Sequence, residues 1–249
     1  MADDTTPPPD RRDALKALYQ QASGCTRCAE LAATRQTVVF GAGNADADLM
    51  FVGEAPGATE DKLGLPFVGA AGKLLEQLLN EIGIARADVF IANVLKCRPP
   101  GNRDPEPGEI ENCRPYLSRQ VELIQPRVIC TLGNFATKLL RGDPTGITKI
   151  HGRPEIRLIG ARPVRLFPIY HPAAALYTRS MLETLREDFS RLPGLLALGP
   201  PTVERPEVPA DRPPLPIRPA AAAPVERAPK DQPITPPSPV EPAQLGLFE

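Results

Sequence analysis

Three polar residues of this sequence lie at or near the ends of short apolar runs, and their types suit hydrogen bonding and proton transfer. Glu54 and His171 each stand just after such a run, and Asn93 interrupts another. Ligands of open α/β sheets bind beyond the carboxyl ends of the strands, so we expect these side chains to converge. An amide can donate to and accept from the edge of a planar base, and an imidazole can carry a proton. Taken singly, the glutamate also fits a surface position and the histidine a structural role.

A glycine-rich loop at residues 65–72 bears on the kind of ligand. It contains Phe67, whose ring either packs in the core or stacks on a flat ligand. The glycines of the chain match neither the dinucleotide pattern GxGxxG after a first strand nor the phosphate loop GxxxxGKS or GxxxxGKT. We therefore expect a pocket for a planar base that contains a histidine, rather than a dinucleotide or nucleoside-triphosphate site.

Four of the five cysteines could form one metal site. Cys25 and Cys28 form a CxxC pair, and Cys97 and Cys113 lie in predicted loop or helix-start sequence. Four converging thiolates suit either a tetrahedral zinc ion or an iron–sulfur cluster, and the spacing does not choose between them. Unconnected free thiols are the third possibility. Cys130 lies inside an apolar run and is expected to be a small buried core residue.

The elements that must position these residues alternate between strand and helix. Apolar runs of strand length are followed by segments with helical periodicity, as crossover connections between parallel strands require. This order predicts an α/β fold with helices around a central four-stranded parallel sheet. The expected strands are residues 48–52, 89–94, 127–132 and 164–170, and the expected helices are 11–21, 71–82, 106–124, 133–140 and 173–191.

The composition limits the classes of function. The formal net charge is −1 and the pI is about 6.2, which gives no overall indication of a polyanionic partner. Residues 141–191 nevertheless carry a surplus of lysine and arginine that could hold phosphates. The chain shows no signal-peptide pattern and no apolar stretch long enough to cross a bilayer, so we expect a soluble, cytoplasmic protein without disulfides.

Most of the 32 prolines of the chain lie near its two ends and suggest the domain boundaries. We expect a disordered leader at residues 1–10, one folded domain at 11–198 and a proline-rich disordered linker at 199–243. Residues 244–249 regain large apolar side chains. A short apolar peptide on a long tether is the usual layout of a docking motif, although a chance apolar terminus is also possible.

Four motifs, in order, closely resemble the family 4 uracil-DNA glycosylases, and the resemblance covers residues 25–191. They are GEAPGATED at 53–61, LPFVGAAG at 65–72, NVLKCRPPGNRDPEP at 93–107 and HPAAAL at 171–176. The resemblance implies a three-layer α/β/α fold and a DNA repair enzyme that flips uracil out of DNA and hydrolyses its N-glycosidic bond. It also implies a structural [4Fe-4S] cluster held by Cys25, Cys28, Cys97 and Cys113.

The resemblance further assigns roles within the pocket. Phe67 would stack on uracil, Asn93 would bind its Watson–Crick edge, and His171 would donate to uracil O2 as the base departs. Glu54 would stabilise the sugar cation or orient water. The remaining implied positions are Gly53 in the uracil pocket, Glu60 against the C5 side of the base, Asn102 as a water-positioning candidate, Leu176 as a wedge in the DNA and Arg179 on a flanking phosphate.

The last residues resemble a second known motif. Gln244, Leu245, Leu247 and Phe248 match the QLxLF peptide with which bacterial repair proteins bind the sliding clamp. The expected partners are therefore uracil-containing DNA and the bacterial sliding clamp, and we expect the protein itself to be a monomer.

Two rival functions stay open at this stage. One is a related class that crosslinks covalently to abasic DNA through a histidine in an inserted basic loop, but residues 99–112 contain neither a histidine nor an insert. The other is a noncatalytic iron–sulfur module that binds DNA and recruits the clamp. The presence of Glu54, Asn93 and His171 argues against this second rival.

Overall fold

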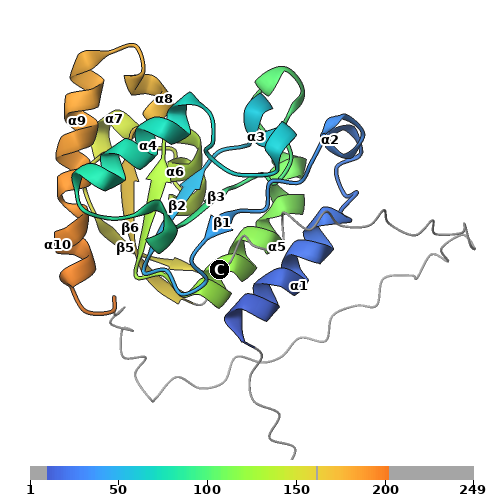
Figure 1. Ribbon diagram of the computed structural model, residues 1–249, viewed down its shortest axis with the longest axis horizontal. Helices are drawn as coiled ribbons and strands as arrows, with labels where there is room; N and C mark the ends of the chain where they lie inside the picture. The colour runs from blue at the N-terminus through green and yellow to red at the C-terminus, as the bar shows by residue number, and fades with distance from the viewer. Residues whose placement is uncertain (1–9, 161, 202–249) are drawn as a thin grey trace, which may run out of the picture.

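The computed structural model describes residues 10–160 and 162–201, and within them one mixed sheet forms the centre of the molecule (Figure 1). The strand order is β1-β3-β2-β4-β6-β5. The four inner strands are parallel, as predicted, and the two edge strands run antiparallel to their neighbours. The strands are β1 Ala42–Gly43, β2 Leu49–Gly53, β3 Phe90–Asn93, β4 Val128–Leu132, β5 Glu155–Ile159 and β6 Arg162–Ile169.

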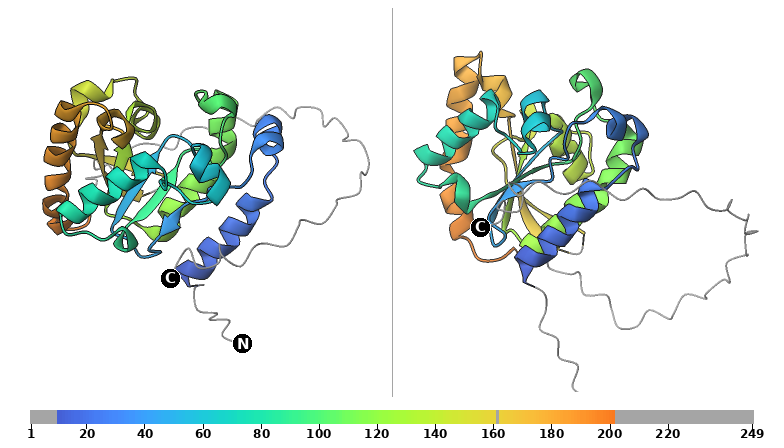
Figure 2. Two further views of the ribbon diagram at one scale, coloured as in Figure 1. Left: turned by 45° about the horizontal axis from the view of Figure 1, so that its top comes forward. Right: turned by 45° about the vertical axis from the view of Figure 1, so that its right-hand side comes forward.

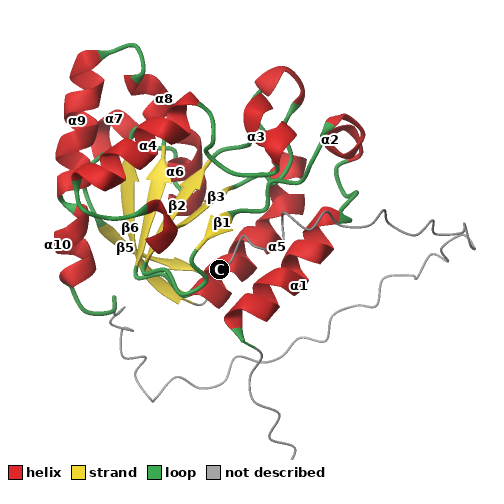
Figure 3. Ribbon diagram, viewed as in Figure 1, coloured by secondary structure: helices red, strands yellow, loops and turns green. Residues whose placement is uncertain are grey.

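Helices cover both faces of this sheet and confirm the three-layer α/β/α prediction (Figures 1 and 3). The α-helices are α1 Arg11–Ser23, α2 Ala29–Thr34, α3 Ala58–Leu63, α4 Ala70–Glu81, α5 Pro107–Ile124, α6 Asn134–Arg141, α7 Ile147–Ile150, α8 Pro172–Ala175, α9 Arg179–Ser190 and α10 Leu192–Ala197. Two short 3-10 helices, η1 Arg86–Asp88 and η2 Pro100–Asn102, lie in the connections.

Alternation along the buried strands produces two separate cores. In β2, Met50 and Val52 point into the layer formed with α1 and α5, whereas Leu49 and Phe51 point toward α4 and α9. All five residues of this strand are buried, which is why its sequence is a continuous apolar run. Cys130 on β4 is fully buried in the second core, as predicted.

The structure differs from the prediction at several places, and the short helices α2, α3, α7 and α10 were not predicted. Edge strands β1 and β5 were not predicted, because β1 has two residues and β5 alternates partly buried with exposed side chains. The expected helix at 173–191 is two helices, α8 and α9, since Thr178 is extended between them. Gly133 is not helical but precedes α6 with a φ of 87°.

The segments predicted at the two ends of the chain lie mostly outside the residues that the structure describes. Asp10 caps α1 by accepting a hydrogen bond from the Arg12 backbone N–H, and residues 1–9 are not described. The proposed linker from residue 202 onward and the peptide at 244–249 also lie outside the described residues. No helix in the described part is long and apolar enough to cross a membrane.

Candidate active site and cysteine cluster

The polar residues predicted to converge do meet at the carboxyl ends of the parallel strands. Gly53 on β2 and Asn93 on β3 are direct partners in the sheet, Glu54 follows β2, and His171 follows β6. Glu54 and His171 line both a cavity of about 710 Å³ and an adjoining one of about 270 Å³. The strand ends therefore bring a carboxylate and an imidazole to one crevice, with the amide of Asn93 on the strand next to the one that precedes Glu54.

Phe67 packs against the imidazole of His171, which lines this crevice. The two ring centroids are 5.5 Å apart and the planes are inclined by 30°. Phe67 is buried in spite of lying in a loop, and its φ of 52° is in the left-handed region that costs a non-glycine residue free energy. Strain of this kind persists only where the surroundings hold it, so the position of the ring is strongly constrained.

Glu60 supplies part of that constraint. Its carboxylate oxygen Oε1 accepts hydrogen bonds from the backbone N–H groups of Val68 at 3.0 Å and Gly69 at 2.9 Å. These bonds fix the two residues that follow Phe67. The structure thus gives Glu60 a loop-holding contact that the resemblance did not indicate, in addition to its position near His171.

Asn93 is 2 % exposed, and its Oδ1 has no hydrogen-bond partner within the described residues. A buried carbonyl oxygen without a partner is costly, so this atom is available to accept a hydrogen bond from a ligand. Gly53 allows this approach, because a Cβ at that position would collide with Asn93 Oδ1 and with the Phe67 ring.

Lys96 was not singled out in the sequence, yet it supports the strand end that carries Asn93. It is 2 % exposed, and its Nζ donates to the Asn93 backbone carbonyl at 2.8 Å and to Gln120 Oε1 at 2.7 Å. Burial lowers the pKa of Lys96 to about 7, although the nearby Cys113 and Cys97 act in the opposite direction. The sequence signal that could have indicated its burial is its position directly after the apolar residues Val94 and Leu95.

Replacing Lys96 with methionine should lower the melting temperature by about 2 to 10 °C, because two buried acceptors lose their donor while the apolar stem is kept. Thermal unfolding followed by circular dichroism measures this change. Lys62→Met, at an exposed position on α3, is the matched control and should melt with the parent protein. Equal melting temperatures for the two variants would contradict the assigned role of Lys96.

The backbone determines which nitrogen of His171 carries the proton. His171 precedes α8, and its Nδ1 accepts a hydrogen bond from the Ala173 backbone N–H at 3.1 Å. A neutral imidazole that accepts at Nδ1 must carry its hydrogen on Nε2. Burial lowers the pKa of His171 to about 4, an effect that the Glu60 carboxylate partly opposes. His171 is therefore a neutral donor near pH 7.

This ionisation state can be measured directly. The ring carbon signal of His171 should stay constant from about pH 8 to about pH 5 and shift only as the pH approaches about 4, because protonation must break the Ala173 bond. Nuclear magnetic resonance of protein labelled in histidine follows it, and His151→Gln assigns the second signal. A titration midpoint of His171 near the ordinary imidazole value of about 6.5 would contradict a neutral ring that accepts from Ala173.

Glu54 lies in the same cavity with a second carboxylate. Burial raises the pKa of Glu54, and the charge of Asp104 raises it further. Asp104 lines the larger cavity with Glu54, and sequence analysis did not single it out. Negative charge gathered on this side of the crevice would favour a cation formed there.

The remaining predicted site residues lie at the rim or on the surface. Asn102 lines the smaller cavity with Glu54, and its Oδ1 accepts from Arg98 Nε at 2.7 Å. Leu176 follows α8 and Arg179 is the first residue of α9, and neither residue lines the crevice. Arg179 makes an exposed ion pair with Glu183 at 3.4 Å.

The four cysteines predicted to form one site influence one another. Burial raises the pKa of Cys97, and the charges of Cys25 and Cys28 add to this effect. Burial likewise raises the pKa of Cys113 to about 11, with Cys97 and Cys28 contributing. The four thiols therefore share one neighbourhood. No three His, Cys, Asp or Glu side chains within residues 10–160 and 162–201 are placed to hold a metal ion.

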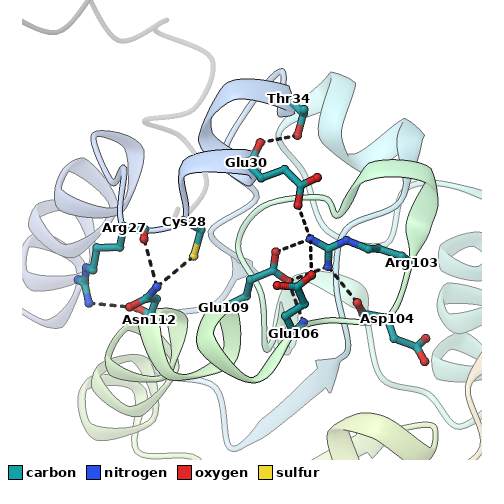
Figure 4. Close-up of polar contacts among 9 residues, drawn as sticks. All are labelled: Arg27, Cys28, Glu30, Thr34, Arg103, Asp104, Glu106, Glu109 and Asn112. Atoms are coloured by element: carbon teal, nitrogen blue, oxygen red, sulfur yellow. Dashed lines mark hydrogen bonds and ion pairs between the residues drawn. The ribbon is translucent and has the colours of Figure 1, made fainter.

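Hydrogen-bond donors point at two of these sulfur atoms. Arg35 donates from Nη1 to Cys97 Sγ at 3.2 Å. Asn112 donates from Nδ2 to Cys28 Sγ at 3.5 Å (Figure 4). Donors of this kind stabilise thiolates, the form of cysteine that binds metals. The chemistry of the site is thus compatible with a group that takes four thiolate ligands.

Arg103 fastens the segments that carry the cysteines (Figure 4). Its guanidinium donates to Glu109 Oε1 at 2.6 Å and Oε2 at 3.0 Å, and to Glu30 Oε2 at 2.7 Å. These bonds join α2, which follows Cys28, to the start of α5, which carries Cys113. Arg103 also lines the smaller cavity, so the cysteine region and the crevice share a wall.

Comparison with known proteins agrees with this geometry. Residues 40–192 match the uracil DNA glycosylase superfamily. The chain is 47 % identical to a type-4 uracil-DNA glycosylase of Sulfurisphaera tokodaii, over 72 % of this chain and 84 % of that protein. It is 44 % identical to that of Archaeoglobus fulgidus, over 77 % and 98 % respectively, and 45 % identical to that of Thermotoga maritima, over 68 % and 87 %.

The matched region contains all the residues that converge on the crevice. It begins at residue 40, before β2, and ends at residue 192, after His171 and α9. Identity above 40 % over most of the length of each relative extends well beyond the motifs themselves. This chain therefore belongs to the uracil DNA glycosylase superfamily and, within it, to the type-4 uracil-DNA glycosylases.

Proposed function

We propose that this protein removes uracil from DNA by hydrolysing the N-glycosidic bond, which leaves an abasic site and starts base excision repair. The observation that carries the proposal is that Phe67, Asn93 and His171 lie together at the strand ends: Phe67 packs against His171, and Gly53 lies against both Phe67 and Asn93. His171 lines the crevice, and because its Nδ1 accepts from Ala173, its Nε2 carries the hydrogen. A flat ring, an unpaired amide oxygen and a neutral donor match a pyrimidine with N–H and C=O groups.

The proposed reaction breaks the bond between the sugar C1′ and uracil N1. The bonding electrons leave with the base as a uracil anion, and His171 donates a hydrogen bond from Nε2 to the oxygen where charge develops. The sugar becomes an oxocarbenium-like cation, which Glu54 stabilises electrostatically. Water adds to C1′ and loses a proton to the solvent, and the released uracil anion takes one up.

Uracil release from a 30-nucleotide strand with one uracil tests this function. Cleavage at the uracil only after alkali treatment is the expected result, since no lysine nucleophile is implied for strand scission. A denaturant-resistant protein–DNA adduct would instead support the covalent relative. DNA binding without any release would support the noncatalytic module, and either outcome would overturn the proposal.

The proposed cofactor is a [4Fe-4S] cluster bound by Cys25, Cys28, Cys97 and Cys113. When bound, such a cluster would cross-link the three chain segments that carry these four cysteines. Its proposed role is structural. Protein purified without oxygen should contain equal amounts of iron and acid-labile sulfide, and Cys113→Ala should lose both. Cys130→Ala, a matched buried cysteine outside the site, should keep both. Zinc in place of iron and sulfide would contradict the proposal.

The proposed second partner is the bacterial sliding clamp, bound through Gln244, Leu245, Leu247 and Phe248. Support comes from the peptide pattern and its placement after a proposed linker at 199–243 that leaves the catalytic unit at 11–198 free to act as a monomer. Clamp binding should be lost in Leu247→Ala plus Phe248→Ala. Leu215→Ala plus Ile217→Ala, within the linker, is the control and should bind normally.

A further inference from the structure

The turn between α8 and α9 exposes two apolar side chains. Leu176 is 37 % exposed, and Tyr177, at 93 %, is the most exposed large hydrophobic residue in the described ranges. A fully solvated aromatic ring contributes no burial free energy to folding, but both of its faces are available for stacking. The two residues follow directly after the short helix that His171 begins.

This turn is held rigidly to the crevice. Pro172 occupies the first position of α8, Pro172 and Ala175 are buried, and the helix packs against α4 and α9 (Figure 2). His171 itself caps the helix through Ala173. The exposed ring and the imidazole in the crevice therefore lie on one short structural unit, six positions apart in the chain.

The surroundings of the turn suit a nucleic acid. Arg179 follows Tyr177 by two residues, and its side chain is 93 % exposed; among the described residues it forms an ion pair with Glu183, one turn along the same helix. A surface ion pair one turn apart is weak, so the guanidinium can exchange Glu183 for a phosphate at little cost. An exposed aromatic ring next to an available cation is the usual composition of a surface that binds bases and backbone together.

We propose that Tyr177 stacks on the base that stays behind in the opposite strand when the uridine leaves the duplex. The inference rests on the proposed function and names duplex DNA as the substrate whose recognition Tyr177 serves. Extrusion of a nucleotide leaves an unpaired base that has lost its partner, and an aromatic ring offers that base a new contact. Leu176, the shorter side chain, occupies the vacated space beside the crevice.

The stacking contact predicts a dependence on the opposite strand. Tyr177→Ala should lower kcat/KM about 10-fold on a duplex with uracil opposite guanine, and Tyr177→Phe should retain the wild-type value because the ring is kept. On the same strand alone, and on a duplex with an abasic site opposite the uracil, Tyr177→Ala should match the wild type, since the stacking partner is missing.

Several outcomes would overturn the inference. An equal loss on the single strand would mean that Tyr177 contacts the uracil strand, and an unchanged duplex rate would mean that it makes no productive contact. A loss in Tyr177→Phe as large as in the alanine variant would point to the hydroxyl rather than to stacking.

The control substitution is Leu158→Ala, because Leu158 is also exposed, at 57 %, but lies on edge strand β5 opposite Pro163, at the end of β6 remote from His171. It should leave all three rates unchanged. Failure of the proposed function is distinguishable, since the wild type would then release no uracil from any of the three substrates.

Discussion

Replacing His171 with alanine should slow uracil release about 100- to 1,000-fold, the usual effect of removing one preorganised donor from a developing anion. The imidazole is held neutral by burial, its Nδ1 accepts from Ala173, and its Nε2 is therefore the donor. The loss should fall mainly on kcat, because negative charge on the base is fully developed only as the bond breaks. Single-turnover rates on a uracil-containing single strand measure it.

Two variants make this result specific. His171→Gln keeps an N–H donor near the position of Nε2 and should recover part of the lost rate. His151→Gln alters the other histidine, whose Nδ1 lies 2.9 Å from Asp188 Oδ2 and which lines neither cavity, and should keep the wild-type rate. A His171→Ala protein that releases uracil at the wild-type rate would remove His171 from the proposed reaction.

Adding one methyl group at Gly53 should lower kcat/KM about 100-fold, although no polar group is removed. A Cβ there would lie 2.8 Å from Phe67 Cζ and still closer to Asn93 Oδ1, so both groups proposed to bind uracil must shift. The Phe67 loop cannot yield easily, because Gly72 packs against its carbonyl and Glu60 holds the next two residues. A displacement of about 1 Å in a positioned group typically costs this much rate.

Gly194→Ala is the matched control for Gly53→Ala. Gly194 lies in α10, and a Cβ at that position meets no atom within 4 Å. This variant should keep full activity and become slightly more stable, since alanine favours a helix over glycine. Wild-type kcat/KM in Gly53→Ala would show that the crevice does not require the close approach of Asn93 and Phe67.

The sequence was sufficient to predict the inner sheet because its strands are buried on both faces. Such strands are short, continuous apolar runs, and helical periodicity between them specifies parallel pairing. Strand β5 escaped prediction for the opposite reason, since Ile156 and Leu158 are exposed and its pattern is determined by the pairing with β6. The break between α8 and α9 depends on the backbone of Thr178, which no residue type specified.

The site was partly predictable for a related reason. Strand ends meet at one edge of a parallel sheet, so Glu54, Asn93 and His171 could be placed together from their positions alone. The contacts of Lys96 with Gln120 and of Arg103 with Glu30 could not, because each joins residues far apart in the chain. The hydrogen bonds from the Val68 and Gly69 N–H groups to Glu60 depend on the left-handed backbone of Phe67, which the sequence pattern did not indicate.

The helix cap at His171 has a consequence for the evolution of this family. The same side chain that donates into the crevice also begins the helix that presents Leu176 and Tyr177. A substitution at this position would change the side chain that faces the crevice and the start of the helix that presents Leu176 and Tyr177 in one event, and few side chains can both accept from the Ala173 N–H and donate into the crevice. We therefore expect residue 171 to tolerate substitution less than residues 176 and 177, which carry no cap.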